Sequence, residues 1–411
     1  MILLRRKYLF YTLALLSGIF TSLMVATDVW ITVRVVPNPY VFALCSFMVG
    51  SIVHVLILII ATAKMNRKKF IGTVLDPNFL GFFIPKNGLL KHLILAGLGN
   101  AISTISYVYV VALTQDPSSV LPFTNLVTAY LIIGDLMIEK EKPVLIEVHA
   151  FFMIILGAIL VSLSRGIVNL AGLALVLGPM NLGTFLYVYE QKKARTIKIR
   201  GKRYDSINLR VWSLLFTTIF VIIMAPLIVG PESIVLSIVI SIAHFFVIAL
   251  DMLLAFFAYV LYIRALGMGK MSVVNALVSV SVVISLPLTL ILAWVFPDVY
   301  ILPDLSGVFG LVRIIGIIFV FLGMTALSFS EVVGYILIKS RPGSGSKLLK
   351  KLSTIKGVEY VSATAGKYDY IVRIKIRSLG KAYENVLQKI IKIEEIIDFV
   401  WISVLKEWEL V

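Results

Sequence analysis

Apolar segments long enough to cross a lipid bilayer follow one another through about the first 330 of the 411 residues, and the rest has the polarity of a soluble protein. Overall, 60% of the residues are hydrophobic and 15% are charged, against about 45–50% and about 25% in soluble domains. A lipid-facing surface accounts for this excess. We therefore expect a membrane domain at 1–330, followed by a water-exposed domain at 331–411.

A helix that spans the membrane needs about 20 mostly apolar residues. The pattern predicts ten such spans, at about 8–31, 39–63, 90–113, 117–138, 145–164, 169–190, 208–229, 236–265, 271–296 and 306–328.

Lys and Arg gather before the first predicted span and after the second, sixth and tenth, whereas the alternate loops hold mostly acidic residues. An excess of Lys and Arg marks cytoplasmic loops, so we expect a multi-pass protein of the plasma membrane with both termini in the cytoplasm. These loops account for the net charge of +16. Nucleic-acid binding is not expected.

Two stretches match at a spacing of 153 residues. The matched pairs are Tyr109 with Tyr262, Ala112 with Ala265, Leu113 with Leu266, Ser119 with Ser272 and Val120 with Val273. Each stretch ends one span, turns and begins the next. The first turn is predicted outside the cell and the second inside, so two five-span halves, about 8–164 and 169–328, would have opposite topology. Such 5+5 inverted repeats are common among transporters.

With the glycine-containing phrases 155–161 and 316–323, this repeat resembles the drug/metabolite transporter superfamily, in its ten-helix EamA-type branch. The resemblance covers about 8–328. It implies an α-helical carrier with a central cavity, often lined by the third, fourth, eighth and ninth helices.

Asp251 lies near the middle of the eighth predicted span. A carboxylate at bilayer depth is costly and should face the protein interior or a wet cavity. His244 lies two helical turns earlier, nearly on the same face, and Tyr259 and Tyr262 extend that face. We expect Asp251 to support proton-coupled exchange or to bind a substrate ammonium group; its alternative role is to hold two helices together.

Other polar residues within the predicted spans are further candidates for binding substrate. They are Asn100, Ser103 and Tyr107 on the third span, Asn125 on the fourth and Asn275 on the ninth. The alternative for the amides and hydroxyls is hydrogen bonding between helices. Asp28 is expected near the outer end of the first span, within reach of water.

We find no Gly-rich phosphate loop, no His-Glu-x-x-His motif and no Ser/His/Asp set within one compartment, so an enzyme or an ATP-driven pump is not expected. The single cysteine, Cys45, excludes a disulfide framework and a cysteine-based metal site. No cofactor or metal is predicted.

After about residue 330 the hydrophobic period changes. Strands are predicted at 333–340, 358–365, 368–376 and 396–405, and helices at 344–355 and 379–393. The order βαββαβ is that of a ferredoxin-like α+β domain.

Gly357-Val358 and Gly366-Lys-Tyr-Asp369 resemble motifs of the effector-binding domain of Lrp/AsnC regulators. The resemblance covers about 333–411. It implies a homodimer joined through 331–411 and an effector related to amino acids, bound near Gly366, Tyr368 and Asp369. Gly366 can adopt positive φ in the turn, and Asp369 either caps that turn or meets a ligand ammonium. The DNA-binding part of those regulators is not expected here.

Together these features predict a secondary transporter, an exporter, of a small metabolite such as an amino acid. Efflux is favoured because the cytoplasmic domain would respond to the internal metabolite level. The alternatives are a membrane-anchored metabolite receptor that transports nothing, and a lipid scramblase.

Overall fold

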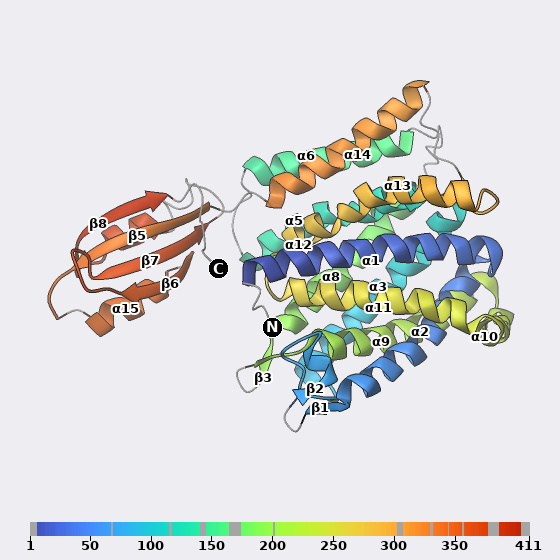
Figure 1. Ribbon diagram of the computed structural model, residues 1–411, viewed down its shortest axis with the longest axis horizontal. Coiled ribbons are helices and arrows are strands. Elements are labelled where there is room, and N and C mark those ends of the chain that lie inside the picture. Colours follow the sequence, from blue (N-terminus) through green and yellow to red (C-terminus); the bar gives the residue numbers. More distant parts are fainter. Residues whose placement is uncertain are drawn as a thin grey trace. The chain divides into compact units, whose positions relative to one another are not determined.

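The computed structural model describes residues 6–403 except 67–68, 115–116, 140–144, 164–173, 200–201, 302–306, 329–331, 344, 356 and 377–385. The chain divides into two compact units: 1–142 with 148–327, and 143–147 with 328–411. Figure 1 shows helices in the first unit and a sheet with helices in the second.

The first unit is mostly helical. Its α-helices are α1 (Arg6–Arg34), α2 (Pro39–Thr62), α3 (Asn87–Thr114), α4 (Pro117–Asn125), α5 (Val127–Glu139), α6 (Leu145–Leu163), α8 (Asn181–Thr196), α9 (Ser206–Val229), α10 (Glu232–Ala243), α11 (Phe245–Leu266), α12 (Met271–Val278), α13 (Val280–Val295) and α14 (Gly307–Ser328). Shorter elements are β1 (Lys64–Asn66), β2 (Lys69–Phe70), a 3-10 turn (Ile71–Thr73), a π-helical turn (Val176–Met180), β3 (Lys198–Ile199) and β4 (Lys202–Arg203).

Seven helices in the described part of the chain are long and apolar enough to cross a membrane. They are Leu9–Arg34, Pro39–Thr62, Gly88–Leu113, Val120–Met137, Ser206–Val229, Phe245–Leu266 and Met271–Val295. Three further apolar helices are shorter: Val148–Gly157, Glu232–Ala243 and Gly307–Gly323. The first unit is therefore a region of membrane-type helices, and the count of ten stays a prediction.

The eighth predicted span, 236–265, is not one helix. The structure divides it at His244 into α10 and α11. One helix over 236–265 would be about 45 Å long at about 1.5 Å per residue, whereas the hydrocarbon core is about 30 Å thick. The 22 residues of α11 cover about 33 Å by themselves, and α10 packs separately on α2.

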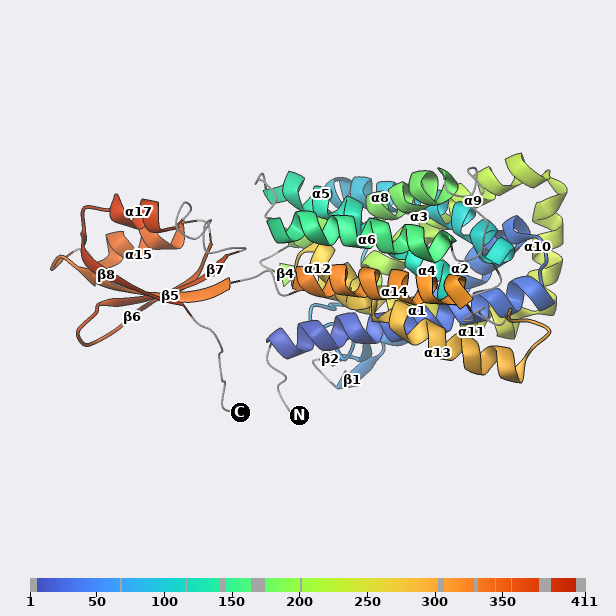
Figure 2. The same ribbon diagram turned by 90° about the horizontal axis from the view of Figure 1, so that it is seen from above.

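Helices far apart in the sequence pair closely. α1 packs along α11, and α3 packs along α8, as both ribbon views agree (Figures 1 and 2). In the second pair Gly99 and Gly183 bring the backbones together: a Cβ atom on either glycine would lie 2.6–2.7 Å from the carbonyl oxygen of the other. In the first pair the Ser17 hydroxyl donates to the Ala258 carbonyl oxygen at 2.8 Å. Small residues such as these let two helix backbones approach closely, and a serine hydroxyl at such a contact can bond to a carbonyl of the neighbouring helix.

Two helices are interrupted at equivalent places. The first break, at Leu126, separates α4 from α5, and the second, at Ser279, separates α12 from α13. They lie 153 residues apart, the spacing of the sequence repeat. The broken helices pack on each other, α4 with α13 and α5 with α12.

Polar side chains join these broken helices. The Ser279 hydroxyl donates to Asn125 Oδ1 at 2.6 Å, and the Asn275 amide donates to the Thr128 hydroxyl at 2.7 Å. The Asp135 carboxylate accepts the backbone N–H groups of Met271 and Ser272 at 3.1 and 2.8 Å. A carboxylate at this position supplies acceptors for N–H groups that have no partner within the helix. Its charge also interacts favourably with the positive end of the α12 dipole.

The second unit is an antiparallel sheet with helices on one face (Figure 2). Its elements are β5 (Val332–Ser340), α15 (Gly345–Ser353), β6 (Val358–Ala363), β7 (Tyr370–Ile376), α17 (Gln388–Ile391) and β8 (Ile396–Ser403). The strand order β6-β7-β5-β8 agrees with a ferredoxin-like fold. Much of the predicted helix 379–393 lies outside the described residues; α17 is its described end. The core joins Ile336, Ile338, Leu348, Leu352, Val372 and Ile390.

Candidate substrate cavity and effector site

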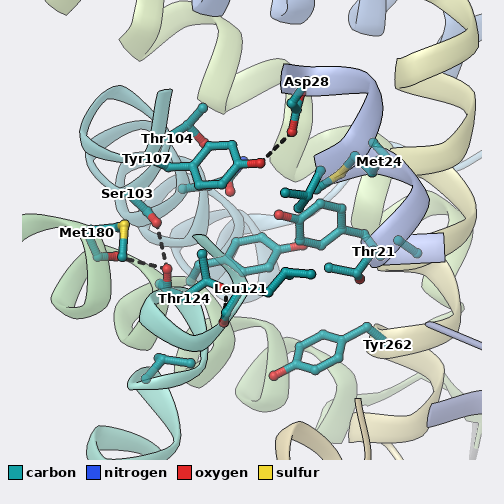
Figure 3. A pocket seen from close by; sticks show the side chains of 18 of the residues that line it. Thr21, Met24, Asp28, Ser103, Thr104, Tyr107, Leu121, Thr124, Met180 and Tyr262 are labelled. Carbon is teal, nitrogen blue, oxygen red and sulfur yellow. Dashed lines mark hydrogen bonds between the residues drawn. The ribbon is translucent and has the colours of Figure 1, made fainter. Parts of the chain in front are cut away.

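A cavity of about 170 Å³ lies inside the helical unit. It is lined from α1, α2, α3, α4, α5, α8, α9, α11, α12 and α13 and from the π-helical turn. On α1, the lining residues Ser17, Thr21, Met24 and Asp28 recur every three or four positions and so share one helix face. Figure 3 shows Asp28 and Tyr107 close together at one part of the cavity and Tyr262 at another.

Seven of the nine predicted substrate residues line this cavity. They are Asn100, Ser103, Tyr107, Asn125, Tyr259, Tyr262 and Asn275. Several also bond to neighbouring helices: Asn100 donates to the Thr217 hydroxyl at 3.2 Å, and Ser103 shares a 2.6 Å bond with Thr184. Their position fits either of the two roles expected from the sequence, and their part in binding stays a prediction.

His244 does not join Asp251. It ends α10, its side chain is exposed, and the chain direction changes there. Asp251 is fully buried in α11. The expected shared face required one continuous helix, so the break removes the geometric basis for pairing these two residues.

Asp251 instead meets two residues of α1. The Thr27 hydroxyl donates to Asp251 Oδ1. The Asp28 carboxyl group is its neighbour. Asp251 itself is absent from the cavity wall; Asp28 lines it. A pair of buried carboxyl groups results, one of them facing the cavity.

Asp28 was expected within reach of water, and the structure corrects this, because only 4% of the residue is exposed. α1 continues to Arg34, beyond the predicted end, and packs along α11 at this level. The Tyr107 hydroxyl donates to Asp28 Oδ2 at 2.6 Å (Figure 3). This bond links α3 to α1 and satisfies one carboxyl oxygen.

Arg210 lines the cavity from α9 and is 2% exposed. Its guanidinium group lies 4.0 Å from the centroid of the Tyr259 ring, a cation–π distance. Nη1 lies 3.5 Å from the Tyr187 hydroxyl oxygen, a long hydrogen bond, and Nε is buried without a partner. In the described part of the chain Arg210 forms no ion pair.

The structure thus adds Asp28 and Arg210 to the sequence candidates. Both are charged residues within predicted spans, and that signal alone marks such residues as candidates for function. Each lies only a few residues from the predicted end of its span, where a charge is ordinarily solvated. Both residues are buried because neighbouring helices pack around them, and the sequence of a single span does not predict that packing.

One end of the helical unit is held together by a second polar cluster. Arg195 donates to Asp76 Oδ2 at 2.7 Å, and the Ser206 backbone N–H donates to the same oxygen at 2.8 Å. Arg195 and Asp76 are both buried. The cluster joins the 71–79 segment to the end of α8 and the start of α9.

The predicted effector residues lie in the turn between β6 and β7. Gly366 has a φ of 152° and open space around it. Asp369 Oδ2 accepts the Ser340 N–H at 2.7 Å and the Ser340 hydroxyl at 3.1 Å, and the Tyr368 carbonyl accepts the Thr364 hydroxyl at 2.6 Å. Asp369 therefore ties the turn to the end of β5. Its Oδ1 has no partner among the described residues, so a ligand role stays a prediction.

Residues 333–409 match the family model described as the Lrp/AsnC ligand binding domain. The chain therefore carries an Lrp/AsnC ligand-binding domain at its C-terminus, next to a region of membrane-type helices.

Other comparisons add little. A search of curated proteins finds no significant match. A structure titled "Crystal structure of PH0061" is 16% identical with a TM-score of 0.19 and covers 32% of this chain and 76% of its own. Another, titled "Crystal structure of protein", is 14% identical with a TM-score of 0.46 and covers 77% and 98%. Scores this low support no argument.

Proposed function

We propose that this protein is a secondary transporter, an exporter, of a small metabolite such as an amino acid, coupled to protons and regulated by a metabolite that binds its C-terminal domain. The single observation that carries the proposal is the cavity within the apolar helices, with the buried Asp28 at its wall and the buried Asp251 beside Asp28. A membrane anchor needs neither a cavity nor buried charges.

The pairing of helices supports a 5+5 inverted repeat of the EamA type. If the two proposed halves are interchanged, the α1–α11 pair takes the place of the α8–α3 pair. The break at Leu126 likewise takes the place of the break at Ser279. α6 and α14, which lie at the predicted fifth and tenth spans, meet through Gly157 and Gly316. Broken helices at a repeat interface commonly border transporter binding sites, and Asn125 and Asn275 line this cavity beside the breaks.

The carboxyl pair supports proton coupling. Two adjacent carboxyl groups in a low-dielectric interior repel each other when both are ionised. Protonation removes that repulsion, and contact with water on one side of the membrane permits release. In this proposal Asp28 exchanges protons with the cavity, and Asp251 acts through Asp28.

Alternating access requires that each end of the cavity open in turn. In this proposal the Asp76–Arg195 ion pair and its Ser206 contacts hold one end of the helical unit together in one of the two states. An effector at the Gly366–Asp369 turn regulates the carrier only if the effector binds the two states of the carrier with different affinities. A domain that senses the internal metabolite level favours efflux.

The test uses the purified full-length protein in liposomes, with exchange of labelled L-amino acids against the unlabelled compound and with an imposed pH gradient. We expect the wild type to exchange an amino acid and to accumulate it when the gradient drives the coupled proton. Asp28→Asn and Asp251→Asn should abolish gradient-driven accumulation. Asp298→Asn is the matched control, because its side chain is 81% exposed and pairs with the exposed Arg34.

Binding without exchange of any tested metabolite would support a receptor and contradict the transporter. Movement of labelled lipid between leaflets of the same vesicles, without metabolite flux, would support a scramblase. Accumulation that survives both Asn substitutions would contradict proton coupling through this pair.

A further inference from the structure

The guanidinium group of Arg210 is a buried charge without a counter-ion. Arginine keeps its proton under all ordinary conditions in proteins, so it cannot become neutral by releasing it. In the described part of the chain no carboxylate pairs with Arg210. Its neighbours are the Tyr187 hydroxyl, the Tyr259 ring and the His54 side chain.

These neighbours compensate the charge only in part. An unpaired buried charge is strongly unfavourable, and a ring face and one long hydrogen bond replace little of the lost hydration. Arg210 is also the fifth residue of α9, near the positive end of that helix dipole, which makes a cation there less favourable still. The site therefore favours an anion from the cavity.

The tyrosines hold the guanidinium in place. Tyr187 and Tyr259 pack edge to face with centroids 5.7 Å apart, and both line the cavity beside Arg210. A fixed planar guanidinium offers parallel N–H donors that match the two oxygens of a carboxylate.

We propose that Arg210 binds the carboxylate of the transported substrate, so that the carrier selects compounds with that anionic group. This inference rests on the proposed transport function and assigns a different role from that of the carboxyl pair: Asp28 and Asp251 carry the proton, and Arg210 recognises the cargo.

The test measures exchange by the full-length protein in liposomes with a panel of labelled L-amino acids and, for each one exchanged, its carboxamide, which lacks the anion. We expect the wild type to exchange the amino acid at least about tenfold better than the carboxamide, and Arg210→Gln to lose at least about tenfold of the amino-acid exchange. Arg210→Lys should be intermediate, because an ammonium keeps the charge but loses the paired donors.

Arg313→Gln is the matched control. Arg313 is also buried, at 1% exposed, but it is absent from the cavity wall and bonds to the Ser118 hydroxyl at 2.5 Å. We expect this variant to retain the exchange rate of the wild type. Size-exclusion profiles and thermal unfolding establish that each variant is folded.

Absence of exchange by the wild type would overturn the transport function and this inference together. Exchange of amino acids and carboxamides at equal rates, or unchanged exchange by Arg210→Gln, would overturn this inference and leave the transport function standing. If Arg210→Gln does not fold, the wild-type preference for the carboxylate and the Arg210→Lys variant decide the question.

Discussion

Gly99 shows how one residue limits helix packing. A Cβ atom there would lie 2.7 Å from the Gly183 carbonyl oxygen. That oxygen belongs to the backbone of a tightly paired helix and cannot move aside as a flexible side chain could. Forced overpacking of this kind costs about 1–3 kcal/mol. We therefore expect Gly99→Ala to lower the unfolding temperature of the purified protein in detergent. Gly88→Ala on the same helix is the control, because nothing lies within 4 Å of its added methyl. Equal unfolding temperatures for both variants would contradict this account.

Asp205, outside the spans, gives a pH effect at the same scale. Burial raises the pKa of its carboxyl group to about 6 from 3.8, although bonds from Asn208 oppose the shift. The folded pKa exceeds the unfolded one, so this contribution to stability is full below pH 3.8 and is lost as pH rises through about 6, in total roughly 3 kcal/mol. Asp205→Asn keeps an acceptor for the Asn208 N–H without the charge. We expect its unfolding temperature to fall less than that of the wild type between pH 4 and 7; parallel curves would contradict the assignment.

Single residues also mark the limit of sequence reasoning about the site. Asp251 was recognisable because it lies mid-span, and it is buried as a carboxylate at that depth should be. Asp28 and Arg210 lie near predicted span ends, where a charge ordinarily reaches water. Only the approach of α3, α9 and α11 encloses them.

At the scale of the element, the breaks at Leu126 and Ser279 place polar groups between crossing helices. Asn125 Oδ1 accepts from the Ser279 hydroxyl at 2.6 Å and from the Asn275 amide at 3.5 Å. Asn125→Ala removes this acceptor. The Ser279 hydroxyl keeps the Asn275 carbonyl at 2.7 Å and the Asn275 amide keeps the Thr128 hydroxyl at 2.7 Å, so the cost is that of the lost bonds, about 0.5–1.5 kcal/mol each. We expect a lower unfolding temperature and slower exchange in liposomes. Thr289→Ala is the control, since the buried Thr289 hydroxyl donates to the Ser285 carbonyl in its own helix at 2.7 Å and the residue does not line the cavity. An equal effect of the two substitutions would contradict a role for this junction.

The periodicity of hydrophobic residues predicted most of these elements, because long apolar runs indicate spanning helices and alternating apolar residues indicate strands. The breaks were not predicted. The residues at His244, Leu126 and Ser279 include neither glycine nor proline, and polar residues such as those beside the breaks also occur within unbroken helices, as Asn100 and Ser103 do in α3. α10 separates from α11 where it packs on α2 through buried Ser233, Ser237 and Ser241. Such a bend depends on the partner helix, which a local pattern does not contain.

At the scale of the whole molecule, the open face of the C-terminal sheet bears on oligomeric state. Leu337 pairs with Val400 on one side and Ile371 on the other, and Tyr335 pairs with Ile402. These side chains alternate with the core residues and point away from the helix-covered face. An apolar sheet face exposed to water favours association, which agrees with the homodimer that the sequence resemblance implies.

We therefore expect Val400→Glu to convert a dimer of the full-length protein in detergent into a monomer, because each copy would place a carboxylate in the apolar interface. Ile391→Glu is the matched control: Ile391 is 59% exposed on α17, on the helix-covered side, whereas Val400 is 38% exposed on the open face. Light scattering after size exclusion measures the mass of each variant. A dimer that survives Val400→Glu, or dissociation by Ile391→Glu alone, would move the interface away from this sheet face.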